Sequence, residues 1–196
     1  MATLLFQGHG SFRITTDDGL VIYVDPYAGQ GYDKLADLIL VTHGHKDHNM
    51  IEKVPKKPET VIISNDDAYQ NGIYETFEQG KIKIIAVPAY NNRHNKNQCV
   101  GYILYFDNIK LYAAGDTSTT EEMSEFAPLE LDYALLPTDG VYNMDAKEAV
   151  KCAALINAKR VIPIHMKPGS LFDEAQALLF DAPNRLIVRP EQEIEL

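Results

Sequence analysis

The spacing of hydrophobic and polar positions along the chain predicts many short strands. Runs rich in β-branched and aromatic residues alternate with Gly, Asp and Asn, which favour turns. The apolar run at Leu38–Thr42 indicates a strand buried on both faces, and Asp107-Asn108 is typical of a hairpin turn. The expected strands cover residues 3–6, 11–15, 20–24, 38–42, 61–64, 81–87, 100–106, 110–113, 133–136, 160–164, 186–188 and 193–196.

Four helices are predicted where a polar residue that can cap a helix precedes apolar positions. Thr119 with Glu122, and Asp145 with Glu148, have the three-residue spacing of a capping box. The predicted helices cover residues 64–77, 119–126, 145–157 and 170–180. Strands with helices between them predict a layered α/β (α+β) fold with its helices outside the sheets. No linker, low-complexity tract or repeat divides the chain, so we expect one domain, residues 1–196.

The composition is that of a globular protein, with 45% hydrophobic and 23% charged residues in a chain of 196. No apolar run approaches the ~18 residues that span a bilayer, and the start of the chain lacks the pattern of a secretory signal. The 18 basic and 28 acidic residues give a net charge of −10, which disfavours long nucleic acids and anionic membranes as partners. Cys99 and Cys152 form no CxxC pattern and leave one disulfide open, but two cysteines fit a reducing cytoplasm better than a secreted protein. We expect a cytoplasmic protein with a small-molecule substrate.

The segment Thr42–His48, with the sequence THGHKDH, carries the strongest chemical signal in the chain, because three of the six histidines lie in it. His43 and His45 are two residues apart in an extended segment, so their side chains leave on one side. Asp47 and His48 follow where the chain must turn. Imidazole and carboxylate groups in this density suit Zn²⁺, Mn²⁺ or Fe²⁺. A solvated polar loop is the alternative, and the number of ligand-type side chains disfavours it.

Other candidate ligands also follow apolar runs. Asp25, Asp116 and His165 each stand just past the end of an apolar run, and His94 lies in the polar loop after the strand 81–87. Active-site residues are concentrated in loops that a rigid scaffold positions in this way. A single Asp after a strand is usually a turn residue, so the prediction depends on all four residues together.

These residues resemble those of the metallo-β-lactamase-fold metal-dependent hydrolases. The sequence is similar to the branch that contains the ascorbate-6-phosphate lactonase-like and phosphodiesterase-like hydrolases, and the similarity covers nearly the whole chain. It rests on the segments Gln7–Ile14, Val24–Pro26, Thr42–His48, Val87–Asn91, Ala114–Thr117, Leu135–Pro137, Tyr142–Asp145 and Ile164–His165.

The resemblance implies a four-layer αβ/βα sandwich, with two packed sheets, helices on the outer faces and two divalent metal ions at one edge. Zinc is the expected metal, with manganese or iron as alternatives. One ion would bind His43, His45 and His94, the other would bind Asp47, His48 and His165, and Asp116 would bridge them, while Asp25 would orient the His-rich loop. If His94 is not a ligand, the site becomes mononuclear.

Such a centre predicts hydrolysis by a water molecule that both ions share. Two bridged ions lower the pKa of that water towards neutrality, and Asp47 can accept a hydrogen bond from it. The ions also neutralise the charge that develops in the transition state. We therefore expect a small, anionic ester, lactone or phosphodiester as the substrate. No G-x-S-x-G motif for a serine nucleophile is present.

Four further residues are candidates for catalysis or substrate contact. His9 could donate a proton or orient a neighbour, although a structural histidine fits equally well. The resemblance makes Asn91 a candidate for substrate binding, together with Tyr90 and Tyr142. Each tyrosine could instead pack in the protein core.

Two other functions remain open from the sequence. The same fold could support an iron-dependent oxidoreductase or dioxygenase, which metal analysis of the purified protein would reveal. A non-catalytic binding protein that keeps the fold is the third reading. The substrate, the metal and the oligomeric state are not determined by these patterns.

Overall fold

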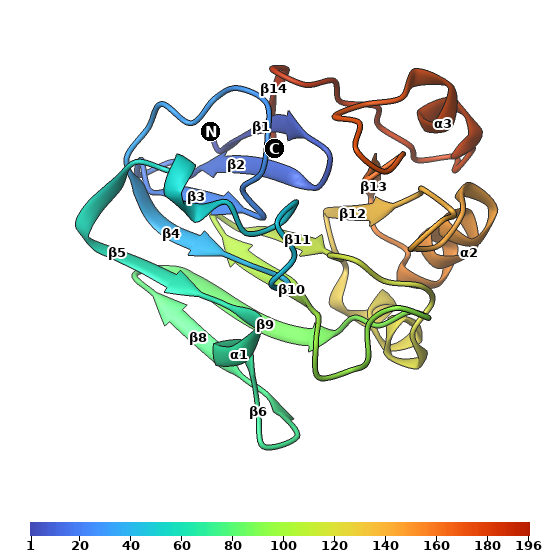
Figure 1. Ribbon diagram of the computed structural model, residues 1–196, viewed down its shortest axis with the longest axis horizontal. Coiled ribbons are helices and arrows are strands. Elements are labelled where there is room, and N and C mark those ends of the chain that lie inside the picture. The colour runs from blue at the N-terminus through green and yellow to red at the C-terminus, as the bar shows by residue number, and fades with distance from the viewer.

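In the computed structural model, which describes residues 1–196, two six-stranded sheets pack face to face (Figure 1). The first sheet has the strand order β14-β1-β2-β3-β4-β5, with β14 at Glu193–Glu195, β1 at Thr3–Gly8, β2 at Ser11–Thr15, β3 at Val21–Val24, β4 at Ala36–Leu40 and β5 at Lys56–Ile63. The second has the order β13-β12-β11-β10-β9-β8, with β13 at Arg160–Ile164, β12 at Tyr133–Pro137, β11 at Ile109–Ala113, β10 at Val100–Phe106, β9 at Ile82–Pro88 and β8 at Thr76–Gln79.

Each sheet combines antiparallel hairpins with a parallel part, and the parallel parts position the candidate site. Strands β3, β4 and β5 are parallel in the first sheet, and β11, β12 and β13 are parallel in the second. Their carboxyl ends therefore lie at a common edge of each sheet, and the loops that follow them meet there. All five residues of β4 are buried, as the apolar run of the sequence predicts.

The apolar faces of both sheets form the main core. Side chains such as Phe6, Ile22 and Leu40 of the first sheet pack against Tyr102 and Leu111 of the second. The hydroxyl of Tyr102 donates a hydrogen bond across this layer to the carbonyl oxygen of Val41, at 3.0 Å. A hydroxyl buried between two sheets needs such a partner, so this bond helps to fix how the sheets pack.

Helices cover the outer face of the second sheet. The helix α2 (Ala146–Ile156) packs its buried face on β12, and its N-cap Asp145 accepts a hydrogen bond from the backbone of Glu148. The short helix α3 (Glu174–Leu179) follows β13, and Figure 1 shows both helices on the same side of the molecule. The outer face of the first sheet is covered instead by loop residues around Tyr32 and by the 3-10 helix η1 (Ile51–Lys53).

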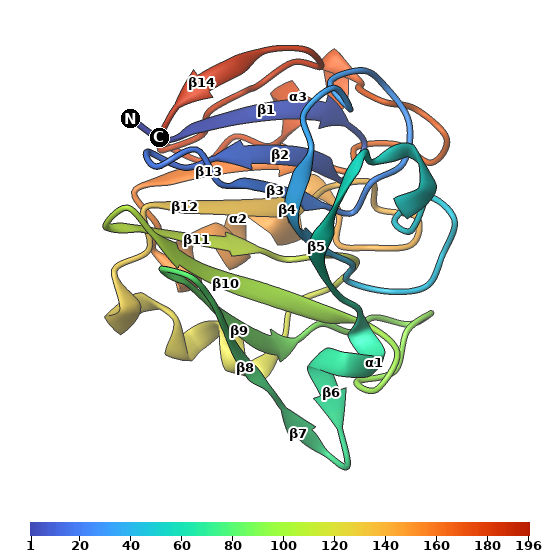
Figure 2. The ribbon, with the colours of Figure 1, turned by 90° about the vertical axis from the view of Figure 1, so that its left-hand side faces the viewer.

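The prediction of a helix for residues 64–77 is wrong beyond the first turn. Ser64 does cap a helix through a capping box with Asp67, but this helix, α1 (Asn65–Ala68), has only four residues. The strands β6 (Tyr69–Gln70) and β7 (Ile73–Tyr74) then form a hairpin that projects from the molecule (Figure 2). Asn71 and Gly72 occupy its turn with positive φ angles of 54° and 86°, which is the conformation that Asn-Gly pairs favour.

Three smaller expectations also need correction. Residues 119–126 form no α-helix: Thr119 donates to Glu148 instead of capping, and the 3-10 helices η2 (Glu121–Glu125) and η3 (Ala127–Leu129) follow. The helix predicted for 170–180 begins at Glu174, with Asp173 as its N-cap. Residues 186–188 are not a strand of either sheet, although the backbone of Leu186 donates to Val161.

The predicted layered α/β architecture, with two packed sheets, is otherwise confirmed. The two ends of the chain lie side by side at the edge of the first sheet in both ribbon views, where the backbone of Leu196 donates to Ala2 at 3.0 Å (Figures 1 and 2). A helix of the length and hydropathy needed to cross a bilayer is not found in the structure.

Candidate metal centre

The His-rich loop that follows β4 is anchored by the carboxylate of Asp25, which follows β3. One oxygen of Asp25 accepts from the backbone N–H of Thr42 at 2.7 Å, and the other accepts from its hydroxyl at 2.7 Å and from Nδ1 of His48 at 2.8 Å. Because Nδ1 of His48 is bonded to Asp25, its Nε2 is the ring nitrogen that faces Asp116 and that a metal would bind in place of a proton. Gly115 lets the loop after β11 come close, since a Cβ there would lie 2.9 Å from the Cβ of Thr42.

Asp116 lies at the centre of the site, between three imidazoles. Its carboxylate oxygens are 3.8 Å from Nε2 of His43, 3.3 Å from Nε2 of His48 and 3.5 Å from Nε2 of His165. All four side chains are buried. These three Nε2 atoms and Oδ1 of Asp116 have no hydrogen-bond partner in the protein, which is costly unless another group binds them.

His94 joins the site from the loop between β9 and β10. Its Nε2 lies 3.3 Å from Nδ1 of His45, and one ring nitrogen from each of His43, His45 and His94 falls within 4.8 Å of the others. His94 is buried, whereas His45 is exposed. The loop therefore turns His94 inward, although its neighbours in the sequence are polar.

These spacings fit a metal ion. Two ligand atoms that each lie about 2.1 Å from one tetrahedral ion are about 3.4 Å apart, and the distances around Asp116 and His94 are 3.3–3.8 Å. Within 4.8 Å of one another, the ligand atoms form three groups: His43, His45 and His94; His43, His48 and Asp116; and His9, Asp47, His48 and His165. The seven predicted ligands are thus brought together, in the two sets that the family resemblance implies, and His9 lies beside the second set.

The charges of the site are set by burial and by neighbouring groups. Burial, together with the nearby His48, lowers the pKa of His43 to about 2, so this imidazole is neutral and can bind a metal at pH 7. Burial opposes ionisation of Asp116, yet His48 and His165 hold its pKa well below the usual range. A hydrogen bond with His9 lowers the pKa of Asp47. Both aspartates are therefore carboxylates.

His9 contacts Asp47 rather than the open part of the site. Its Nε2 lies 3.3 Å from the Asp47 carboxylate and its Nδ1 lies 3.1 Å from the carbonyl oxygen of Ser170, while its side chain is fully buried. The backbone of His165 donates to the carbonyl of His9 at 2.8 Å. This placement favours an orienting role for His9 over direct contact with a substrate.

Three site residues adopt a backbone conformation that side chains other than glycine rarely take. The φ angles of His9, Asp25 and His165 are 59°, 47° and 41°. Such conformations cost energy and persist only where the surrounding structure holds them. Each of the three stands at the end of a strand, where the left-handed turn directs its side chain into the centre.

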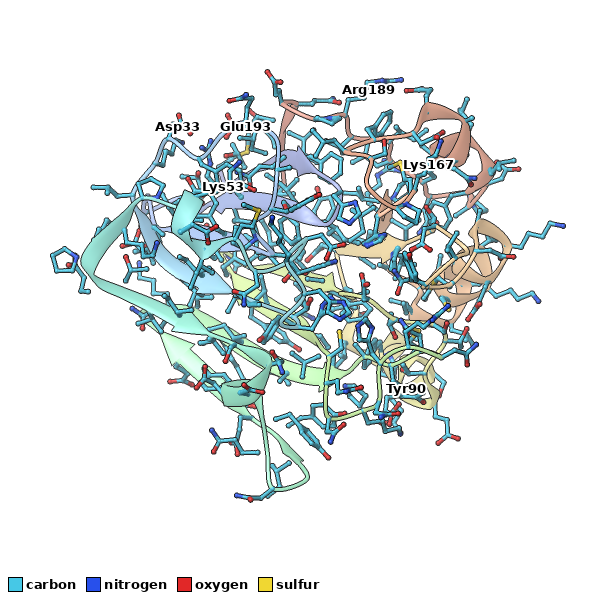
Figure 3. The ribbon with its side chains drawn as sticks, in the orientation of Figure 1. Asp33, Lys53, Tyr90, Lys167, Arg189 and Glu193 are labelled. Carbon is cyan, nitrogen blue, oxygen red and sulfur yellow. The ribbon has the colours of Figure 1, made fainter.

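A cavity of about 480 Å³ opens onto the centre. It is lined by His45, Asp47, Arg93, His94, Asp116, Tyr142 and His165. Tyr142 is thus placed where a substrate contact was predicted. Tyr90 lies outside this lining, with Lys96 over its ring, and Figure 3 shows it at the lower right of the molecule. Asn91 also lies outside the lining, and its side chain donates to Asn143 of the neighbouring loop.

Comparison with known proteins identifies the family. The profile of the β-lactamase superfamily domain matches residues 3–165. A UPF0173 metal-dependent hydrolase from Thermococcus onnurineus is 30% identical, and the match covers 100% of both chains. The chain belongs to the UPF0173 metal-dependent hydrolases. It is therefore an enzyme of the metallo-β-lactamase superfamily that depends on a metal.

Solved structures agree with this assignment. The crystal structure of a candidate metal-dependent hydrolase from Parabacteroides distasonis is 29% identical, with a TM-score of 0.79 over 97% of this chain and 93% of that one. A diiron β-hydroxylase from Streptomyces venezuelae is 14% identical, with a TM-score of 0.74 over 100% of this chain and 54% of that one. At this identity, the second likeness shows only a shared fold.

Sequence reasoning missed three residues at the centre of this UPF0173 hydrolase. Asp139 lies 3.0 Å from Nδ1 of His165, Asn143 donates to Asp139, and Arg93 lines the cavity. Asp139 follows β12 as Asp25 follows β3, so the rule that found the other aspartates would also have found it. Asn143 lies in the segment Tyr142–Asp145 that carries the family resemblance, but its contact with Asp139 depends on how two loops fold. No signal in the sequence marks Arg93.

Proposed function

We propose that this hydrolase binds two divalent metal ions, with zinc as the preferred metal, and hydrolyses a small anionic ester, lactone or phosphodiester. One observation carries the proposal: buried nitrogen and oxygen atoms from His43, His48, Asp116 and His165 have no protein partner and stand at ligand spacing. The set of three histidines around His94 supports a second position. Bound ions would supply Lewis acidity and an activated water.

The protein's own groups have separate tasks in this proposal. His43, His45 and His94 would hold one ion, and Asp47, His48 and His165 the other, with Asp116 between them. Asp25 keeps Nε2 of His48 available by accepting from its Nδ1. His9 holds the carboxylate of Asp47, whose side chain is 39% exposed and can accept a proton from a water molecule in the cavity.

Arg93 supports an anionic substrate. It is the only Lys or Arg among the residues that line the cavity. No carboxylate lies within 4.0 Å of its guanidinium nitrogens, so it forms no ion pair. Its guanidinium stands 5.8 Å from the centre of the Tyr142 ring, an arrangement that holds a cation in place. In a protein with a net charge of −10, an unpaired arginine beside the centre favours a carboxylate or phosphate group on the substrate.

The sequence similarity to lactonase-like and phosphodiesterase-like hydrolases supports the same substrate classes. A screen with added Zn²⁺, Mn²⁺ or Fe²⁺ against phosphodiester, lactone and thioester substrates tests the proposal. We expect turnover by the parent protein and at least a 100-fold loss in His48→Ala, because that change removes one ligand. Equal rates for the variant and the parent would reject this centre as the active site.

An iron-dependent oxidoreductase is the second candidate, because a diiron β-hydroxylase shares the fold and the same ligands accept iron. Metal analysis of protein purified without chelators separates the two. Iron as the main metal, with little zinc or manganese, would favour the oxidoreductase. Bound metal without turnover of any substrate would favour the non-catalytic binding protein.

We also propose a cytoplasmic location and a small-molecule substrate, with no long nucleic acid as partner. Cys99 and Cys152 are both free and buried, which fits a reducing compartment. The cationic group of the cavity is a single arginine, whereas nucleic-acid interfaces use many basic side chains.

A further inference from the structure

Asp139 is held rigidly behind His165. One of its carboxylate oxygens accepts hydrogen bonds from the backbone N–H groups of Val141, Tyr142 and Asn143, at 2.6, 2.7 and 3.3 Å. Its other oxygen lies 3.0 Å from Nδ1 of His165. Asp139 is 7% exposed, so its carboxylate has little water to replace these partners.

Asn143 extends this contact towards the second candidate metal position. Its amide nitrogen donates at 2.7 Å to Oδ2 of Asp139, the oxygen that faces His165, and its amide oxygen accepts from Asn91 at 2.9 Å. The side-chain oxygen of Asn91 in turn accepts from the backbone N–H of His94 at 2.8 Å. A continuous line of polar contacts, here called the Asn bridge (Asn91, Asn143 and Asp139), therefore joins His94 to His165.

His94 and His165 belong to different ligand groups and come from different loops, one after β9 and one after β13. Side chains behind metal ligands fix the orientation of those ligands. A connected polar network also loses more than one contact when a member is removed, since each buried group left behind lacks a partner. The Asn bridge thus ties the position of one loop to that of the other.

We infer that Asp139 and Asn143 are positioning residues that hold His94 and His165 in one arrangement, so that the two metal positions fill together. The inference rests on the proposed function, because it assumes ligand roles for these two histidines. Metal uptake at one position would therefore help to place the ligand histidine of the other position.

Asn143→Ala tests this inference directly. The change removes the contact to Asn91 and leaves Asp139 bonded to the backbone of residues 141–143, so the loop of His94 is freed while His165 keeps its neighbour. Asp139→Asn is the complementary variant, because it removes the carboxylate behind His165. Asn97→Ala is the matched control, since Asn97 is an exposed residue of the same loop as His94.

The measurement is the zinc content of each protein, by mass spectrometry of the metal, after dialysis against increasing concentrations of a chelator. We expect the parent and Asn97→Ala to lose both equivalents together. In Asn143→Ala one equivalent should leave at about 10- to 100-fold lower chelator strength, which separates the two steps. Asp139→Asn should also lose zinc at a lower chelator concentration than the parent.

Two results would overturn the inference. The first is a curve for Asn143→Ala that coincides with that of the parent. The second is a parallel shift of both equivalents, which a general loss of stability would give. If the parent binds a single equivalent of zinc, the dinuclear part of the proposed function fails separately. The Asn bridge then requires that Asn143→Ala lower the affinity for that one ion about 10-fold.

Discussion

At the scale of single residues, the centre depends on groups that prepare each histidine for its role. Asp25 accepts a hydrogen bond from Nδ1 of His48, which leaves Nε2 as the nitrogen that faces Asp116, and burial keeps His43 neutral. The left-handed backbones of His9, Asp25 and His165 store strain that the surrounding bonds must balance. The proposed centre therefore depends also on side chains that lie behind the candidate ligands.

Arg93 provides a residue-scale prediction about substrate choice. Arg93→Gln should raise KM about 10-fold or more for an anionic substrate, because one charge-assisted contact is lost, and should leave a neutral analogue of that substrate almost unchanged. Steady-state kinetics on the matched pair of substrates measures this. Lys151→Gln, an equal loss of charge on the exposed side of α2, serves as the control. A similar change in KM for both substrates would remove Arg93 from substrate recognition.

At the scale of elements, local signals worked where nothing competed with them. The His-rich loop was predictable because its residues are adjacent in the sequence, and Asp116 and His165 because each follows a clear strand. The helix expected for 64–77 failed because the capping box at Ser64 was weighed without the Asn71-Gly72 turn. Asn143 and Arg93 could not be predicted, since their contacts join loops that are remote along the chain.

The helix α2 gives a prediction about stability. Asp145→Ala removes the side-chain acceptor for the backbone N–H of Glu148, a bond of 2.8 Å, and should lower the free energy of unfolding by about 1 kcal/mol. Asp145→Asn keeps an acceptor at the same place, so its free energy of unfolding should fall by only a small part of that amount. Urea unfolding followed by circular dichroism measures both variants. Equal losses in the two would show that the cap bond is not the cause.

At the scale of the whole molecule, the candidate ligands join the two sheets. Asp25 and the His-rich loop follow strands of the first sheet, whereas Asp116, Asp139 and His165 follow strands of the second. Bound ions would thus link the two sheets at this edge, in addition to hydrogen bonds such as those from Tyr102 to Val41 and from His165 to His9. Binding to the native state alone raises its stability by mass action.

Removal of metal should therefore destabilise the entire fold. With free zinc at 100 times its Kd, the gain of about 2.7 kcal/mol corresponds to a fall in Tm of about 5–10 °C when a chelator is added, for a chain of this size. Calorimetry with and without chelator measures the difference. His48→Ala should show a smaller shift, because it binds less metal. An unchanged Tm in the parent would mean that the ions do not hold the sheets together.

The order of the ligands along the chain has a consequence for biosynthesis. The His-rich loop leaves the ribosome early, yet its partner His165 is made only after most of the protein, including α2, has been translated. Until then, a nascent chain would lack one of the candidate ligands. Full loading with metal is therefore tied to completion of the second sheet, and a product that ends before β13 stays without a finished centre.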